Sequence, residues 1–260
     1  MKLTLDDEAL MINVEPVDVP GEIIDCLFTG GLDKDSSSSV TVSGCRDSDH
    51  SLLSISSELV PGGVLSLSVS SGVVTIMNMT TDGNVDTIQV PSNVPHVRSK
   101  RDTGIKYPAE VELKTDVWYD SSLLDKFDGS HERTKGWLTE VIFHTKTFFV
   151  NPTLEVKVVL IPGEKQYFDV KPLKADGADI NRLAVENLNP KANKTVLNSY
   201  FCYDVDCTSE ACLQGVSFGS AACNKDGYAV NINEYYSENN TVFKTAIIFT
   251  HELGHNLGML

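Results

Sequence analysis

Hydrophobic and polar residues alternate in short runs over the first 90 positions, and no run there has the spacing of an amphipathic helix. The clearest runs, rich in β-branched residues, are residues 40–42, 65–69 and 73–76. Between such runs lie glycine-containing pairs and triplets typical of turns: Gly30-Gly31, Pro61-Gly62-Gly63 and Asp82-Gly83. The pattern predicts a β-rich unit at the N-terminus.

From residue 109 onward, strand-like and helix-like patterns take turns. Residues 109–119 alternate like a strand, and residues 154–161 form a more apolar strand that we expect at the centre of a sheet. Residues 131–150 carry an apolar stripe at helical spacing, a short helix is expected at 179–188, and a short strand at 215–221. Strands that alternate with helices favour a mostly parallel sheet with helices on both faces. This part therefore predicts an α/β fold.

The last predicted helix begins with the apolar segment 241–250 and continues into H-E-x-x-H, formed by His251, Glu252 and His255. Residues four apart share one face of a helix, so the two imidazoles can bind one metal ion. Glu252 lies beside them and can accept a proton from a water acidified by zinc. Gly258 can end the helix and turn the backbone back toward the metal. Two histidines on an exposed helix could arise by chance, but H-E-x-x-H-x-x-G is far more specific.

The composition narrows the class of protein. The net charge of −15 argues against nucleic acid and anionic membrane surfaces as partners. No apolar run is long enough to span a bilayer, so we expect no membrane span. With 260 residues and a hydrophobic fraction of 41%, the chain fits a globular protein of more than one compact unit.

Residues 91–101 have the composition of an exposed linker between two different units. Arg98, Lys100 and Arg101 fit the R-x-K-R pattern that furin-type convertases cut in extended segments. The alternative is a solvated charge run without a function. The position at a composition boundary, after two prolines, favours processing. We therefore predict a β-rich domain at 1–101 that is removed by a convertase, followed by a second domain at 102–260.

Cysteines and glycosylation sequons favour an extracellular protein. The six cysteines are Cys26, Cys45, Cys202, Cys207, Cys212 and Cys223. We expect Cys26 and Cys45 to pair, and the last four, which lack a C-x-x-C, to form two disulfides rather than a zinc site, with three pairings open. The sequons predict glycans at Asn78, Asn193 and Asn239. Because the first ten residues lack a secretory core, we expect a signal peptide upstream of this chain.

Four stretches of the sequence resemble the reprolysin (adamalysin or ADAM-like) branch of the metzincins. Residues 251–259 are similar to the zinc helix of that family, and residues 215–223 to its edge strand, which ends in a cysteine. Residues 110–116 resemble the first catalytic strand, and residues 26–45 resemble the propeptide pattern. The resemblance covers nearly the whole chain, and only its zinc helix is highly specific.

The resemblance implies a secreted zinc endopeptidase zymogen, of a kind that includes arthropod venom enzymes, which cuts extracellular proteins. It implies zinc on His251 and His255, with Glu252 as the general base. An extended polypeptide substrate would lie along an edge strand formed by Val216, Ser217, Phe218 and Gly219. The implied fold is metzincin-like α/β (α+β), a twisted, mostly parallel sheet with helices over an open cleft, in a monomer.

Several family features have no counterpart in this sequence. The third zinc-binding histidine and the methionine turn would follow Leu260, so we expect the C-terminal subdomain to lie beyond this chain. Glu112 matches a family Ca²⁺ ligand, but residues 198–200 offer no aspartate partner, which leaves calcium open. No cysteine lies between Cys45 and the cleavage site to act as a latency switch. The alternative reading is an inactive truncated product or gene fragment that acts as a binding or inhibitory protein.

Overall fold

The computed structural model describes residues 2–5, 8–24, 26–44, 51–60, 63–70, 73–79, 85–87, 110–150, 157–168, 195–203, 215–217, 221–222, 230–235 and 241–258. The chain divides into two compact units, and each has its own β-sheet. The first unit comprises residues 1–18, 25–111 and 146–159, and the second comprises residues 19–24, 112–145 and 160–260.

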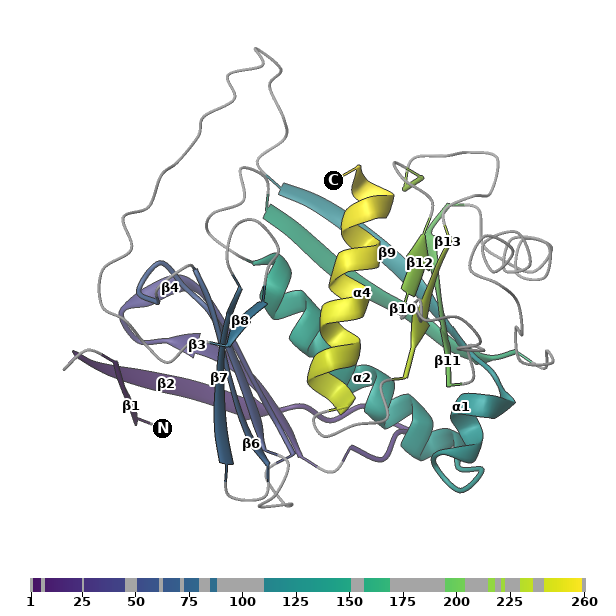
Figure 1. Ribbon diagram of the computed structural model, residues 1–260, viewed down its shortest axis with the longest axis horizontal. Helices are drawn as coiled ribbons and strands as arrows, with labels where there is room; N and C mark the ends of the chain where they lie inside the picture. The colour runs from purple at the N-terminus through teal and green to yellow at the C-terminus, as the bar shows by residue number, and fades with distance from the viewer. Residues whose placement is uncertain are drawn as a thin grey trace, which may run out of the picture. The chain divides into compact units, whose positions relative to one another are not determined.

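Eight strands form the first sheet, and they follow one another in sequence order (Figure 1). They are β1 (Lys2–Leu5), β2 (Glu8–Pro16), β3 (Leu27–Leu32), β4 (Asp35–Ser43), β5 (Leu52–Ser56), β6 (Val64–Ser70), β7 (Val73–Met79) and β8 (Val85–Thr87). Each strand pairs antiparallel with the next. The predicted β-rich N-terminal unit is confirmed, and the three alternating runs lie in β4, β6 and β7.

One predicted turn is wrong, because Gly30 and Gly31 lie inside β3, where the register against β4 shifts. A Cβ atom on Gly30 would lie 1.9 Å from the backbone oxygen of Asn13 on β2. Only a residue without a side chain allows this close approach of two strands. The glycine pair therefore marks an irregular strand and not a turn.

The core of the first unit follows the period-two pattern of its strands. On β2, Leu10 and Ile12 are 2% and 1% exposed, whereas Met11 between them is 44% exposed. Further buried side chains complete this core: Leu32, Val40, Ile55, Val60 and Leu65. Alternate residues of a strand point to opposite faces, so this apolar core lies on one face of the sheet.

The second sheet has five strands in the order β10-β9-β11-β13-β12. Its members are β9 (Glu110–Tyr119), β10 (Lys157–Tyr167), β11 (Leu197–Cys202), β12 (Gly215–Ser217) and β13 (Val230–Glu234). β9 and β13 each pair parallel with β11, whereas β12 pairs antiparallel with β13. The predicted mixture of strands and helices is confirmed. β10 was expected at the centre but lies at one end of the strand order.

Among the described residues, three helices accompany this sheet: α1 (Ser121–Asp125), α2 (His131–Phe149) and α4 (Thr241–Leu257). α2 and α4 confirm the predicted helices, and the helix predicted at 179–188 lies outside the described residues. α1 is a single short helix capped by Asp120, whose carboxylate accepts from the backbone N–H of Leu123. The same carboxylate accepts from the Tyr200 hydroxyl on β11 at 2.6 Å, which ties the helix start to the sheet.

α2 and α4 lie on the same face of the second sheet (Figure 1). The hydroxyl of Thr145 on α2 donates to the backbone oxygen of Ala246 on α4 at 3.3 Å. The ring of Phe249 on α4 meets the ring of Phe201 on β11 with centroids 5.1 Å apart, and both side chains are fully buried. These contacts fix the helix that carries the H-E-x-x-H motif.

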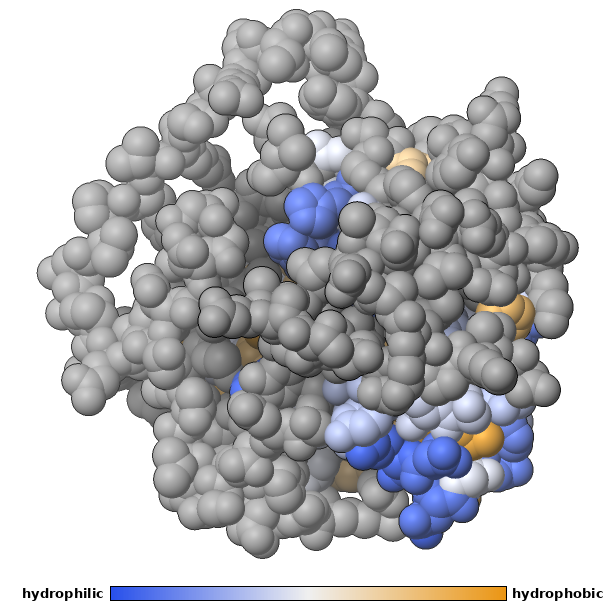
Figure 2. Space-filling view, turned by 45° about the vertical axis from the view of Figure 1, so that its right-hand side comes forward, coloured by the Kyte–Doolittle hydropathy of each residue, from blue (hydrophilic) through white to orange (hydrophobic). Residues whose placement is uncertain are grey.

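The described surface is mainly hydrophilic. Figure 2 shows hydrophilic residues over most of the coloured surface on that face, with single hydrophobic residues between them. Among the described residues, the exposed large hydrophobic side chains are Met11, Ile23, Leu59 and Tyr167. Within the same ranges, no helix has the length and apolar character needed to cross a membrane.

Candidate metal and catalytic site

One side of helix α4 is buried, and the other side, which carries His251, is accessible to solvent. Phe243, Ala246, Phe249 and Leu253 are all fully buried, whereas His251 is exposed. The helix ends at Leu257, and Gly258 follows with φ 83°, a left-handed conformation that glycine adopts without strain. Its N–H donates to the backbone oxygen of His255 at 2.9 Å. The predicted glycine break after the motif is therefore present.

The two histidines turn their side chains toward one point. The Nε2 atoms of His251 and His255 lie 2.9 Å apart, and the two rings meet edge to face with centroids 4.4 Å apart. Two imidazole nitrogens that converge in this way suit the donor set of a zinc ion. Within the described ranges, no group of three or more His, Cys, Asp or Glu side chains that could hold a metal is present. The described residues thus bring together the two histidines that the sequence predicts as zinc ligands.

Glu252 lies between these histidines in sequence, but its side chain is only 4% exposed. Burial raises the pKa of the Glu252 carboxyl, and this outweighs the opposing influence of the Ser217 hydroxyl and of the two histidines. Ser217 Oγ and Glu252 Oε2 are both buried, and neither makes a hydrogen bond of full geometry among the described residues. A buried carboxylate with an unused oxygen is ready to accept a proton from a bound molecule.

Gly215 brings strand β12 into direct contact with Glu252. A Cβ atom on Gly215 would lie 2.6 Å from Oε1 and 2.8 Å from Cγ of Glu252, so any side chain there would displace the carboxylate. The two residues that follow, Val216 and Ser217, are half-buried in β12, the last strand in the sheet order. The structure therefore brings the predicted edge strand and the predicted general base together. Phe218 and Gly219 lie outside the described residues.

A ladder of buried asparagines holds the C-terminal turn of α4 against the sheet. Asn231 Nδ2 donates to Asn256 Oδ1 at 2.9 Å, and Asn233 Nδ2 donates to Asn231 Oδ1 at 2.7 Å. The N–H of Ala222 donates to the backbone oxygen of Asn256 at 2.9 Å. All three asparagines are fully buried. Sequence reasoning missed this ladder, although the N-x-N spacing on β13 places Asn231 and Asn233 on one face of a strand.

The predicted disulfides have two different outcomes. Cys26 is disulfide-bonded, as predicted, and its expected partner Cys45 lies outside the described residues. Cys202 was expected in a disulfide, but the structure gives it a thiol. It ends the fully buried strand β11 and is 1% exposed, so the sheet encloses its sulfur. The other predicted disulfide residues, also outside the described part, are Cys207, Cys212 and Cys223.

The remaining predicted positions are spread over the chain. The cleavage residues Arg98, Lys100 and Arg101 and the sequon residues Asn193 and Asn239 all lie outside the described residues. Asn78 lies within β7, where it pairs with Leu65 on β6 and Asp86 on β8. Glu112, the candidate calcium ligand, is exposed on β9.

Comparisons with known proteins give structural likenesses and no family. No family model matches the chain, and no curated protein matches it. A chain in a solved structure described as "Structure of a chaperone-substrate complex" aligns with 75% of this chain at a TM-score of 0.41 and 12% identity. The alignment covers 27% of that chain, so this protein spans about a quarter of its length. At this level the likeness carries no statement about function.

Proposed function

We propose that this protein is the precursor of a secreted zinc endopeptidase of the reprolysin type that cuts extended polypeptides. The observation that carries the proposal is the approach of His251 Nε2 and His255 Nε2 to 2.9 Å, with Glu252 beside them against the edge strand. The histidines would hold the metal, and Glu252 would move the proton. The sequence motif and the folded geometry support the same assignment.

Residues of α4 and β12 have different roles in the proposed peptide hydrolysis. When bound, zinc would polarise the scissile carbonyl and acidify a water molecule. Glu252 would accept a proton from the attacking water and donate it to the leaving amine. Because burial raises the pKa of Glu252, its carboxylate is a stronger base than an exposed one. Gly215 leaves the space that this carboxylate occupies.

The substrate would bind along β12 as an added strand. Val216 and Ser217 pair with β13 on one side, and β12 is last in the sheet order, so its outer edge is the place for an extended peptide. Phe218 and Gly219 follow Ser217 in sequence. Backbone pairing of this kind accepts many side chains, which suits a protease that cuts proteins of varied sequence.

Processing and secretion are part of the same proposal. A furin-type convertase would cut after Arg101 within Arg98-Ser99-Lys100-Arg101, between a β-rich propeptide and a catalytic domain. The disulfide at Cys26 supports an oxidising compartment, where such bonds persist. The mature enzyme would act as an extracellular monomer.

The test measures zinc content by elemental analysis and casein digestion with the same preparations. We expect one zinc per chain, lost in His251→Ala and in His255→Ala. Glu252→Gln should retain zinc but lose about 100- to 10,000-fold in cleavage rate, the usual contribution of a general base. Glu58→Gln, on an exposed residue of the first unit, serves as the control.

Each result of this test separates the candidates. A chain without zinc, or one whose cleavage survives Glu252→Gln, would contradict the proposal. Zinc at one equivalent without cleavage in the wild-type chain would favour the other candidate function, a binding or inhibitory protein.

A further inference from the structure

A six-residue segment that precedes the linker belongs to the unit that carries the zinc helix. Val19–Ile24 is part of the second unit, whereas the residues before and after it belong to the first. Conversely, Lys146–Val159, which follows the linker, belongs to the first unit. Each unit therefore contains residues from both sides of Arg101, and a cut there would not divide the protein into its two compact units.

Val19–Ile24 rests its backbone on the first half of α2. The N–H of Ile23 donates to the backbone oxygen of Glu132 at 3.0 Å. A Cβ atom on Gly136, one turn further along the helix, would lie 1.9 Å from the backbone oxygen of Ile23. Helix α2 therefore carries a glycine at the position where another segment of backbone touches it.

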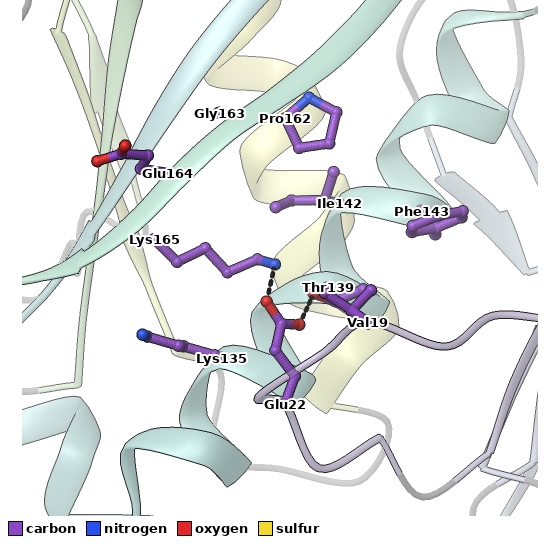
Figure 3. A pocket seen from close by; sticks show the side chains of 10 residues that line it. All are labelled: Val19, Glu22, Lys135, Thr139, Ile142, Phe143, Pro162, Gly163, Glu164 and Lys165. Atoms are coloured by element: carbon purple, nitrogen blue, oxygen red, sulfur yellow. Dashed lines mark hydrogen bonds and ion pairs between the residues drawn. The ribbon is translucent and has the colours of Figure 1, made fainter.

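The side chain of Glu22 is the charged anchor of the segment. Its Oε1 lies 2.6 Å from Nζ of Lys165 on β10, and its Oε2 accepts from the hydroxyl of Thr139 on α2 (Figure 3). The side chains of Glu22 and Lys165 are only 8% and 10% exposed. Removing one partner of such an enclosed pair leaves an uncompensated charge, so Lys165 and Thr139 select strongly for a carboxylate.

A cavity of about 570 Å³ lies beside this anchor, and Glu22 and Lys165 both line it. Ile142 and Phe143 contribute an apolar wall to it, and Lys135 adds a second positive charge to its lining (Figure 3). The combination suits a turn-forming peptide with one carboxylate side chain. Val19-Pro20-Gly21-Glu22-Ile23-Ile24 has this form, because the N–H of Glu22 donates to the backbone oxygen of Val19 at 3.1 Å and Gly21 has φ 79°.

We propose that Gly136, Thr139 and Lys165 form a docking site, here called the Glu22 site, for an acidic peptide that contains a tight turn. Its resident ligand is Val19–Ile24, so the N-terminal fragment stays bound to the second unit after the linker is cut. This inference rests on the proposed processing at Arg101. The cleaved protein is then a non-covalent pair of fragments held partly by the Glu22–Lys165 ion pair, at a site distinct from the H-E-x-x-H motif.

The experiment captures the whole chain by an N-terminal tag, cuts the linker with furin, and follows loss of the C-terminal fragment by surface plasmon resonance. The fragments of the wild-type protein should stay together through native washing. Separation during the first wash would overturn the inference. If furin does not cut, the processing proposal fails, and a variant with a tobacco etch virus protease site at residues 95–101 supplies the cut instead.

Variants of the ion pair test whether the Glu22 site holds the fragments. Glu22→Gln should release the C-terminal fragment about 100-fold faster. Without Glu22, the buried charge of Lys165 is no longer compensated, and its desolvation weakens the complex. The double variant Glu22→Lys with Lys165→Glu, which reverses both charges, should recover part of that loss. Glu15→Gln, at an exposed position of β2, is the control and should leave the release rate unchanged. Equal release rates for wild type and Glu22→Gln would contradict the inference.

A peptide competition does not depend on how well the variants fold. A synthetic peptide of residues 17–25, added in excess to the cut wild-type complex, should accelerate release of the C-terminal fragment. The same peptide with Gln in place of Glu22 is the matched control and should have little effect. Equal effects of the two peptides would show that the carboxylate is not recognised.

Discussion

The two sheets of this protein are assembled by different rules. In the first, each strand pairs with its neighbour in sequence, and every pair is antiparallel. In the second, β9, β11 and β13 pair in parallel, although long stretches of sequence separate them. Parallel pairs need crossover connections, so their order cannot follow from short-range pattern. The candidate site lies on the second sheet, where its parts come from distant positions in the chain.

The two units also bury polar groups differently. The first sheet encloses hydroxyl pairs such as Ser54 and Ser66, whose Oγ atoms lie 3.2 Å apart. The second encloses the ladder of Asn231, Asn233 and Asn256, in which each amide is oriented by its neighbours. A hydroxyl can rotate to suit a partner, whereas an amide has fixed donors and acceptors. The second unit therefore depends more on one defined geometry.

The largest expected effect comes from the buried rings of the second unit. Phe249→Ala should lower the free energy of unfolding by about 3–5 kcal/mol, because it leaves a cavity beside Phe201. Ile55→Ala is the counterpart in the first unit, with an expected loss of about 2–5 kcal/mol. Hydrogen exchange should locate each loss in its own sheet. Equal loss of protection in both sheets from either variant would contradict separate compact units.

Gly215→Val tests the contact between the edge strand and the candidate base. The added side chain would overlap Glu252, so we expect a loss of about 1–3 kcal/mol in thermal or urea unfolding. Ser217→Ala, two residues along β12, removes a buried hydroxyl that lacks a full hydrogen bond and should be nearly neutral. The contact would be refuted by a Gly215→Val protein as stable as the wild type.

Asn256→Ala tests the ladder that holds the last turn of α4. It leaves the Asn231 amide without its acceptor, and we expect a loss of about 1–3 kcal/mol in urea unfolding. Ser54→Ala in the first sheet should cost less, about 0.5–1.5 kcal/mol, because one neutral hydrogen bond is lost there. A larger loss of stability in Ser54→Ala than in Asn256→Ala would show that the asparagine ladder does not stabilise the protein more than a hydroxyl pair does.

Because of His144, the stability of the second unit depends on pH. Burial lowers the pKa of His144 to about 3 in the folded protein, whereas an unfolded histidine has a pKa of about 6.5. The unfolded state therefore binds the proton first, and the stability present above pH 6.5 falls as the pH drops toward 3. The steepest loss is about 1.4 kcal/mol per pH unit. Unfolding of His144→Gln should show a shallower slope between pH 6.5 and 4.5, and an unchanged slope would contradict this assignment.

The sequence predicted elements whose period is long and regular. α2, α4 and the alternating strand β9 were predicted to within two residues of their observed ends. β11 was missed because all six of its residues are buried, which removes the alternation that marks a strand. α1 was missed because it is one short turn fixed by the Asp120 cap and not by an apolar stripe.

The site was predictable only where its geometry is local. The four-residue spacing of His251 and His255 determines that their side chains can meet, and Gly258 directly follows the helix end. The contact of Gly215 with Glu252 joins residues 37 positions apart, and no short-range pattern encodes it. β10 was placed at the centre because it is apolar, but its position in the sheet order depends on the crossovers.

The sequential order of the first sheet bears on the order in which the protein forms. Neighbouring antiparallel strands make local contacts, and chains rich in local contacts fold fast. The N-terminal part also leaves the ribosome first. Val19–Ile24 lies between β2 and β3, so it is positioned by a formed hairpin before α2 has been synthesised. Val19–Ile24 would then serve as a preformed contact on which α2 assembles.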